Sequence, residues 1–333
     1  MIEVTLYVPS DHSVGGPPPA HGIGGRNMRF AVNLPNCMHV AAITQPWEHH
    51  LTGADIARVA QHAEQLGYSM VFLPEHFLTS TSHLEFSGNH YFDATTAQAF
   101  IAGATSTITI GSMVTILPLH NPVVMAKAIA TLDWLSGGRA QATVGVGWLK
   151  DEYDAIGVPF NKRGRIADEC LAAMFELWDS DSPTFDGEFV KFDDVAFGPK
   201  PISKPHPTVW MGGDADAVLR RAAKFGDGWA PWLTKPDELP AKMDYLRSQP
   251  EFDDRPFSLF YSLAVLSIGE EHAIIDDPNA QFGQNAQQVI DNCNMLAERG
   301  VTDTWVNPPE LKGLNAYLDH MQWVAEEIIP KVG

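Results

Sequence analysis

The chain has 333 residues, 45% of them apolar and 19% charged, a balance typical of a globular protein with a large core. Its formal net charge of −19 argues against a nucleic-acid groove or an anionic membrane surface as its partner. The three cysteines, Cys37, Cys170 and Cys293, are far apart and form no Cys-x-x-Cys pair. We therefore expect reduced thiols in a cytoplasmic protein and no disulfide framework.

Residues 1–27 differ in character from the rest of the chain. Their first basic residue is Arg26, no apolar segment follows it, and the run from Gly15 to Pro19 would break a helix. The pattern does not fit a secretory signal. We interpret residues 1–27 as a flexible N-terminal extension and expect one domain over residues 28–333.

From Met28 onward, strand-like runs alternate with helical patterns, as in successive βα units of a parallel sheet. A proline- and aromatic-rich insert, residues 183–207, contains a predicted hairpin around Phe185–Phe189. The alternation predicts an α/β fold, a (β/α)8 TIM barrel with an insertion after the fourth βα unit. The expected strands are residues 29–34, 70–73, 107–117, 139–146, 208–211, 228–230, 257–268 and 302–306.

Glycines mark the end of the expected fourth strand. Gly145 and Gly147 flank Val146, so the backbone there is bare and a flat ligand or a phosphate could approach it closely. Tight packing of a helix on the strand would also favour glycine at these positions. The glycines alone leave both interpretations open.

Longer motifs around these glycines resemble a known family. LSGGR, GVGWLKDEY and GVPFNKRGRIADE follow one another between Leu135 and Glu169. In this order they resemble the bacterial luciferase-like monooxygenase superfamily, in particular its branch of oxidoreductases dependent on the deazaflavin coenzyme F420. The resemblance extends from Met28 to about Trp232.

The resemblance implies a luciferase-like barrel that uses coenzyme F420 to pass a hydride to or from a small organic substrate. The alternative is a monooxygenase that uses reduced FMN and O2. A third class is a relative that binds the cofactor without turnover. In each case the protein positions the cofactor ring against the substrate. We expect a homodimer and no nucleic-acid or membrane partner.

In a barrel of this kind the active site lies at the carboxyl ends of the strands. His76 follows the expected second strand, and its imidazole could transfer a proton. The resemblance places this histidine beside the cofactor ring. Glu75 either orients His76 or is a solvated loop charge. Both residues are our candidates for catalysis.

Further cofactor-binding residues follow from the resemblance and from a glycine pair before a helix. Gly212 and Gly213 precede a predicted helix start, where N–H groups favour an anion, and the family holds its cofactor phosphate there. We expect Asp214 to turn away and cap that helix. The resemblance also brings Tyr153 to the phosphate. Arg163 and Arg165 either add positive charge or are ordinary surface arginines.

The resemblance implies a non-proline cis peptide in the third strand, at Met113–Val114 or a neighbouring bond, where it would support the cofactor ring; an ordinary buried strand is the alternative. Gly145, Val146 and Gly147 are further candidates for binding the cofactor. Trp148 occupies the position of an acidic proton donor in a sugar-phosphate dehydrogenase of the superfamily, which argues against a sugar phosphate substrate. A set of aromatic residues suggests a largely apolar substrate: Trp47, Phe77, Phe86, Tyr91 and Trp148. The spacing of His83 and His90 fits no metal template, and we predict no metal site.

Overall fold

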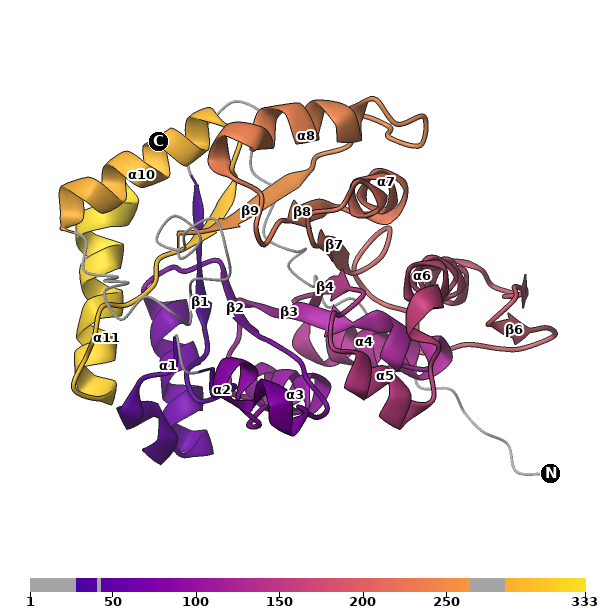
Figure 1. Ribbon diagram of the computed structural model, residues 1–333, viewed down its shortest axis with the longest axis horizontal. Coiled ribbons are helices and arrows are strands. Elements are labelled where there is room, and N and C mark those ends of the chain that lie inside the picture. Colours follow the sequence, from indigo (N-terminus) through magenta and orange to yellow (C-terminus); the bar gives the residue numbers. More distant parts are fainter. Residues whose placement is uncertain (1–27, 41–42, 264–284) are drawn as a thin grey trace, which may run out of the picture.

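The computed structural model describes residues 28–40, 43–263 and 285–333. Expectations for residues 1–27, and for the part of the seventh strand beyond residue 263, therefore lie outside the described residues. Within those residues, eight parallel strands form a closed barrel in the order β1-β10-β9-β8-β7-β4-β3-β2. Figure 1 shows the strands in the middle with helices around them. The predicted barrel is confirmed.

The strands of the barrel begin and end within a few residues of the predicted bounds, apart from the undescribed end of the seventh. The third begins two residues later than predicted and the fourth is shorter at both ends. The insert contains the predicted hairpin, in which Phe185 pairs with Phe192. The strands are β1 (Arg29–Asn33), β2 (Met70–Leu73), β3 (Thr109–Ile116), β4 (Gln141–Gly145), β7 (Thr208–Gly212), β8 (Gly228–Ala230), β9 (Ser258–Ser262) and β10 (Asp303–Trp305), with β5 (Phe185–Asp186) and β6 (Lys191–Phe192) in the hairpin.

Side chains at the helix starts explain several boundaries. Asn121 accepts hydrogen bonds from the N–H groups of Val123 and Val124, and Asp93 accepts one from Thr96 N at 2.7 Å, as expected of N-cap residues. Gly137 ends the fourth helix with φ 75°. The helices are α1 (Gly53–Gln65), α2 (Leu84–Ser87), α3 (Ala94–Ala104), α4 (Pro122–Ser136), α5 (Lys150–Ile156), α6 (Arg163–Asp179), α7 (Asp216–Phe225), α8 (Leu239–Arg247), α10 (Ala286–Glu298) and α11 (Leu314–Trp323).

The apolar core has two layers, as a packed barrel requires. One cluster of buried side chains fills the space between the strands and the surrounding helices. A smaller cluster fills the barrel interior, so the centre is a packed core and the free space for a ligand lies at the ends of the strands. The interior cluster consists of Ala31, Met70, Phe72, Trp210, Ala230 and Phe260, with Met113 and Trp305 against it.

Candidate active site

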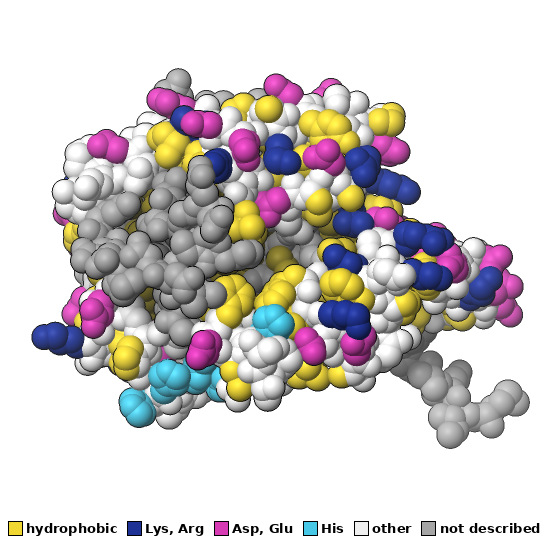
Figure 2. Space-filling model, viewed as in Figure 1, with side chains coloured by type: hydrophobic (Ala, Val, Ile, Leu, Met, Phe, Trp, Pro, Cys, Tyr) yellow, Lys and Arg dark blue, Asp and Glu magenta, His cyan; other side chains and the backbone are white. Residues whose placement is uncertain are grey.

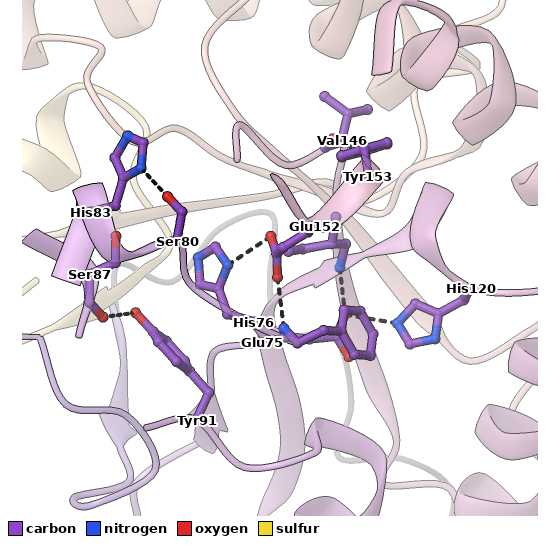
Figure 3. Close-up of polar contacts among 12 residues, drawn as sticks. Glu75, His76, Ser80, His83, Ser87, Tyr91, His120, Val146, Glu152 and Tyr153 are labelled. Atoms are coloured by element: carbon purple, nitrogen blue, oxygen red, sulfur yellow. Dashed lines mark hydrogen bonds and ion pairs between the residues drawn. The ribbon is translucent and has the colours of Figure 1, made fainter. Parts of the chain in front are cut away.

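His76 lies directly after β2 and is held by a glutamate from another part of the barrel. Its Nδ1 is 3.0 Å from Glu152 Oε2, in α5, and Glu152 Oε1 accepts a hydrogen bond from Phe77 N at 2.7 Å (Figure 3). The Glu152 side chain is fully buried, whereas that of His76 is 13% exposed. A carboxylate fixed in this way favours the tautomer with the proton on Nδ1, which leaves the Nε2 lone pair to accept a proton.

Glu75 does not orient His76, and it is not a solvated charge. It is 4% exposed, and its Oε2 accepts hydrogen bonds from Ile116 N and His120 Nε2, both at 2.8 Å (Figure 3). Glu75 and His76 follow β2, which ends at Leu73, and their side chains reach different partners. Both interpretations of Glu75 made from the sequence were therefore wrong: Glu75 joins the end of β2 to the end of β3.

Aromatic side chains surround His76. Tyr91 lies edge-on at a ring-centroid distance of 4.8 Å and Trp148 at 6.1 Å. Trp148, which follows β4, is 46% exposed and also contacts Phe86 of the long loop after β2. Three of the five predicted aromatic residues thus form one wall. The other two lie elsewhere: Phe77 contacts His120, and Trp47 packs on Tyr317.

The peptide between Met113 and Val114 is cis, as the resemblance implied. At this point the pairing of β3 with β4 shifts register, between Met113 and Thr115. The Val114 side chain lies over two glycines of the neighbouring strands. A Cβ atom at Gly145 would lie 2.8 Å from Val114 Cγ2, and one at Gly212 would lie 2.5 Å from Val114 Cγ1. Packing against Val114 therefore requires glycine at both positions.

Tyr153 is placed differently from the expectation of direct contact with a phosphate. Its side chain is fully buried, and its hydroxyl donates a hydrogen bond to the carbonyl oxygen of Val146. Since its one hydroxyl proton is already donated, Tyr153 has none left for an anion. It supports the loop from Val146 to Gly147, whose glycine has φ 63° and lies against Ile116.

The loop after β7 also differs from the prediction. The Gly213 N–H donates to Ala230 O at 3.0 Å, so the cradle expected from this N–H group is wrong. Asp214 turns away as expected but does not cap α7, because its Oδ1 accepts from the N–H groups of residues 232–234. The residue before α7 is Ala215, whose side chain cannot cap a helix. The N–H groups of the first turn of α7 therefore lack a side-chain cap.

Cations gather beside this loop despite the acidic composition. Figure 2 shows Lys and Arg side chains over the region that α5 to α8 occupy in Figure 1. Lys242 Nζ lies 3.0 Å from Asp214 O, next to the start of α7. Arg163 stacks on the Phe160 ring, and its Nε is buried without a hydrogen-bond partner among the described residues. Arg165, in contrast, pairs with Glu188 at the surface.

Sequence reasoning missed Glu152 and His120, the partners of His76 and Glu75. Glu152 stood inside the motif GVGWLKDEY, but its contact with a residue 76 positions earlier depends on how β4 lies in the barrel. Within the described residues, no group of three or more His, Cys, Asp or Glu is arranged to hold a metal ion. No helix in that part of the chain is long and apolar enough to cross a membrane.

Comparisons with known proteins agree with this geometry. An FMNH2-dependent dimethylsulfone monooxygenase from Pseudomonas putida is 28% identical over 227 residues, which are 67% of this chain and 61% of that protein. The monooxygenase RslO1 from Streptomyces bottropensis superposes with a TM-score of 0.74 at 20% identity, over 91% of this chain and 99% of that one. An F420-dependent tetrahydromethanopterin reductase from Methanopyrus kandleri gives a TM-score of 0.70 at 17% identity, over 92% and 100%. These structures share the fold.

The family assignment comes from a match over nearly the whole chain. The family model for luciferase-like monooxygenases matches residues 28–325, which is the barrel without the N-terminal segment. Members of this family are oxidoreductases and monooxygenases, and the similar proteins include both FMN- and F420-dependent enzymes. This chain belongs to the luciferase-like monooxygenase family.

Proposed function

We propose that this protein is an oxidoreductase that uses the deazaflavin coenzyme F420 to transfer a hydride to or from a small organic substrate. The observation that carries the proposal is His76 at the mouth of a luciferase-like barrel, oriented by the buried Glu152. The motifs from Leu135 to Glu169 favour the F420 branch. The deazaflavin would accept the hydride from the substrate or donate it, and the protein would supply binding, orientation and a group that takes up or returns the proton.

The residues at the mouth suit a cofactor with a flat ring and an anionic tail. Val114, laid over Gly145 and Gly212, forms an apolar surface for the ring. The uncapped first turn of α7 and the unpartnered Nε of Arg163 suit the anion. The two helices that carry these groups are joined, because Arg221 of α7 donates to Gly164 O of α6 at 3.0 Å.

His76 would act on the substrate. When a substrate hydroxyl is oxidised to a carbonyl, its O–H proton must leave as the hydride departs, and His76 Nε2 is the group that would accept this proton. In the reverse direction the same atom would return it. Glu152 would hold the proton on Nδ1 throughout and stabilise the imidazolium that forms. Trp148 and Tyr91 would limit the access of water to His76.

A second candidate function is an FMN-dependent monooxygenase. The dimethylsulfone monooxygenase of Pseudomonas putida, similar over 67% of this chain, is named as FMNH2-dependent. The apolar surface over Val114 would suit either ring. The choice between the cofactors therefore depends on which tail the protein binds and on whether turnover requires O2.

Equilibrium titration of the purified protein with both cofactors, oxidised and reduced, tests the proposal. We expect coenzyme F420 to bind at least tenfold more tightly than FMN, which corresponds to about 1.4 kcal/mol. Micromolar FMN binding without detectable F420 binding would favour the monooxygenase. Turnover that stops when O2 is removed would lead to the same conclusion.

A further inference from the structure

A cavity of about 180 Å³ lies at the ends of β1 and β10, next to the His76 site. It reaches Trp305, which packs against the interior cluster of the barrel. Met38 also lines it, and the Met38 backbone forms an antiparallel bridge with that of Tyr91, whose ring contacts His76. The cavity therefore borders the proposed place of reaction.

Two residues that line this cavity have carboxamide oxygens without a hydrogen-bond partner among the described residues. They are Asn33 Oδ1 and Asn307 Oδ1, and both atoms are buried. Asn307 as a whole is only 8% exposed. Asn33 and Asn307 lie two residues beyond Ala31 and Trp305, which are paired in the barrel, so the two strands bring them to the same level. A buried acceptor without a donor is unfavourable, and a pair of them in one cavity indicates a site for a donor.

Glu48 and Gln45, which also line the cavity, already have hydrogen-bond partners. Glu48 accepts hydrogen bonds from the N–H groups of Asn36 and Gln45. Gln45 accepts from Trp47 Nε1 at 3.0 Å and donates to Pro309 O at 2.8 Å. The two asparagine oxygens are therefore left for a ligand.

The charge of the cavity restricts the kind of ligand. None of the described residues that line it is Lys, Arg or His, whereas Glu48 and Glu310 both do. A carboxylate, sulfonate or phosphate would meet acceptor oxygens and acidic side chains with no cation to compensate, so such groups are excluded on electrostatic grounds. An amino group can donate to both oxygens, and a hydroxyl group can donate to one of them.

We infer that Asn33 and Asn307 bind a hydrogen-bond donor, the hydroxyl or amino group of an alcohol or amine substrate, at the end of β1 and β10. The inference rests on the proposed function, since it names the substrate class of the same site. It replaces the apolar substrate suggested by the aromatic wall with an amphipathic one. The reacting carbon of the substrate lies toward His76, Tyr91 and Trp148. The donor at the two asparagines is a second group of the substrate, separate from the one whose proton His76 accepts.

Binding of matched probes to the cofactor-saturated protein tests this inference. The probes are cyclohexanol and cyclohexylamine, which carry donors, and methoxycyclohexane and cyclohexanecarboxylate, which at neutral pH do not. Calorimetric titration should show the two donors binding at least fivefold more tightly than the other two. Asn33→Leu and Asn307→Leu should each abolish this preference. Asn315→Leu, at an exposed position on α11, should retain it.

Further measurements on the same variants show whether a negative result concerns the fold, the cofactor site or the proposed donor site. Both variants lose an unpaired oxygen, so their melting temperatures should not fall, and their affinity for the cofactor should change less than twofold. In Asn33→Asp the added charge should strengthen cyclohexylamine binding relative to cyclohexanol, which tests the site without loss of an acceptor. Equal binding of ether and alcohol, no binding of any probe, or an unchanged preference in both leucine variants would refute the inference. Failure of the cofactor titration, in contrast, would refute the proposed function itself.

Discussion

At the scale of single residues, substitutions of His76 and Glu152 distinguish a catalytic role of this pair from a structural one. His76→Ala should lower kcat roughly 100-fold, because it removes the proton acceptor. Glu152→Gln should lower kcat at least about tenfold, because an amide can present its NH2 group to Nδ1 and reverse the tautomer. Neither change should alter the cofactor dissociation constant more than a few-fold, since neither residue belongs to the group proposed to bind the anion. Single-turnover rates measure these effects.

The matched control for Glu152 is on the same helix. Asp154→Asn changes an exposed carboxylate of α5 that pairs with Lys150, and it should leave the rate unchanged. Melting temperatures of all three variants should be recorded in parallel. If the variants of His76 and Glu152 lose stability but turn over at the normal rate, the pair is structural and His76 is not catalytic.

Val114 and its two glycines allow a second test at this scale. Gly212→Ala places a methyl group 2.5 Å from Val114 Cγ1, which is closer than the side chain tolerates. We expect this substitution to lower the free energy of unfolding by about 1–3 kcal/mol. Adding Val114→Ala should recover part of the loss, because it removes the atom that clashes. Denaturant titration of the two single variants and the double variant measures the coupling.

Gly103→Ala is the control for this cycle. Gly103 lies in α3 with no atom within 4 Å of an added Cβ, so alanine there should be neutral or stabilise the helix by up to about 1 kcal/mol. If the changes in unfolding free energy caused by Gly212→Ala and Val114→Ala simply add in the double variant, the clash with Val114 does not explain Gly212. Gly212 would then be needed for another reason, such as close approach of the ligand.

At the scale of elements, the loop after β1 and the long loop after β2 are joined by histidines. The ring of His39 stacks on that of His90 at a centroid distance of 3.9 Å and lies 4.0 Å from that of His49. Asn36 connects them, since its Oδ1 lies 2.6 Å from His39 Nε2 and its carbonyl oxygen 3.0 Å from His90 Nε2. Burial, and then the charges of His90 and His49, lower the pKa of His39 from 6.5 to about 4.

This lowered pKa predicts a pH dependence of stability. As the pH falls below about 6.5, the unfolded chain binds a proton at His39 before the folded chain does, so stability should be lost between pH 6.5 and pH 4. Above pH 6.5 His39 is neutral in both the folded and the unfolded chain, so it does not make stability depend on pH. His39→Gln should therefore make the melting temperature fall less steeply over this interval, as scanning calorimetry can measure.

His50→Gln, at an exposed position beside the cluster, is the control and should leave the slope unchanged. Some slope will remain in every variant, because burial also lowers the pKa of His320 to about 4. If the melting temperature falls equally steeply with pH in His39→Gln and in the unmodified protein, the pKa of His39 is not lowered in the folded state. The contact between the two loops would then make no contribution to the pH dependence of stability.

The elements also show what the sequence could predict. Apolar runs predicted the strands, and residues local to the helices mark their ends, since Asn121 and Asp93 cap helix starts and Gly137 ends a helix. The cis peptide at Met113–Val114 followed from resemblance, not from any local pattern. The partners of Glu75 and Asp214 were not predictable, because they depend on how the strand ends lie beside one another when β2 pairs with β3 and β7 pairs with β8.

At the scale of the whole molecule, the distribution of charged side chains matters more for binding an anionic cofactor than the net charge does. A net charge of −19 repels an anionic cofactor at long range, yet basic side chains gather over α5 to α8, where the anion is proposed to bind (Figure 2). Screening at physiological ionic strength limits the general repulsion to about 8 Å, whereas direct contacts persist. The net charge therefore argues against polyanionic surfaces as partners and leaves room for a small anionic cofactor.

The last prediction concerns the N-terminal segment. The family match begins at residue 28, and β1 begins at Arg29, where it pairs with β10 on one side and with β2 on the other. The described strands that close the barrel all begin after residue 27, and the run from Gly15 to Pro19 would break a helix that joined the segment to the barrel. Deleting residues 1–27 should leave the melting temperature and the cofactor affinity unchanged.

Deleting residues 1–33 provides the contrast, because it removes β1, opens the barrel between β10 and β2 and should prevent folding. Scanning calorimetry and cofactor titration of both truncated proteins distinguish the two segments. A clear drop in melting temperature on removal of residues 1–27 alone would show that this segment packs on the barrel or on a second subunit. The boundary of the folded unit would then lie before Met28.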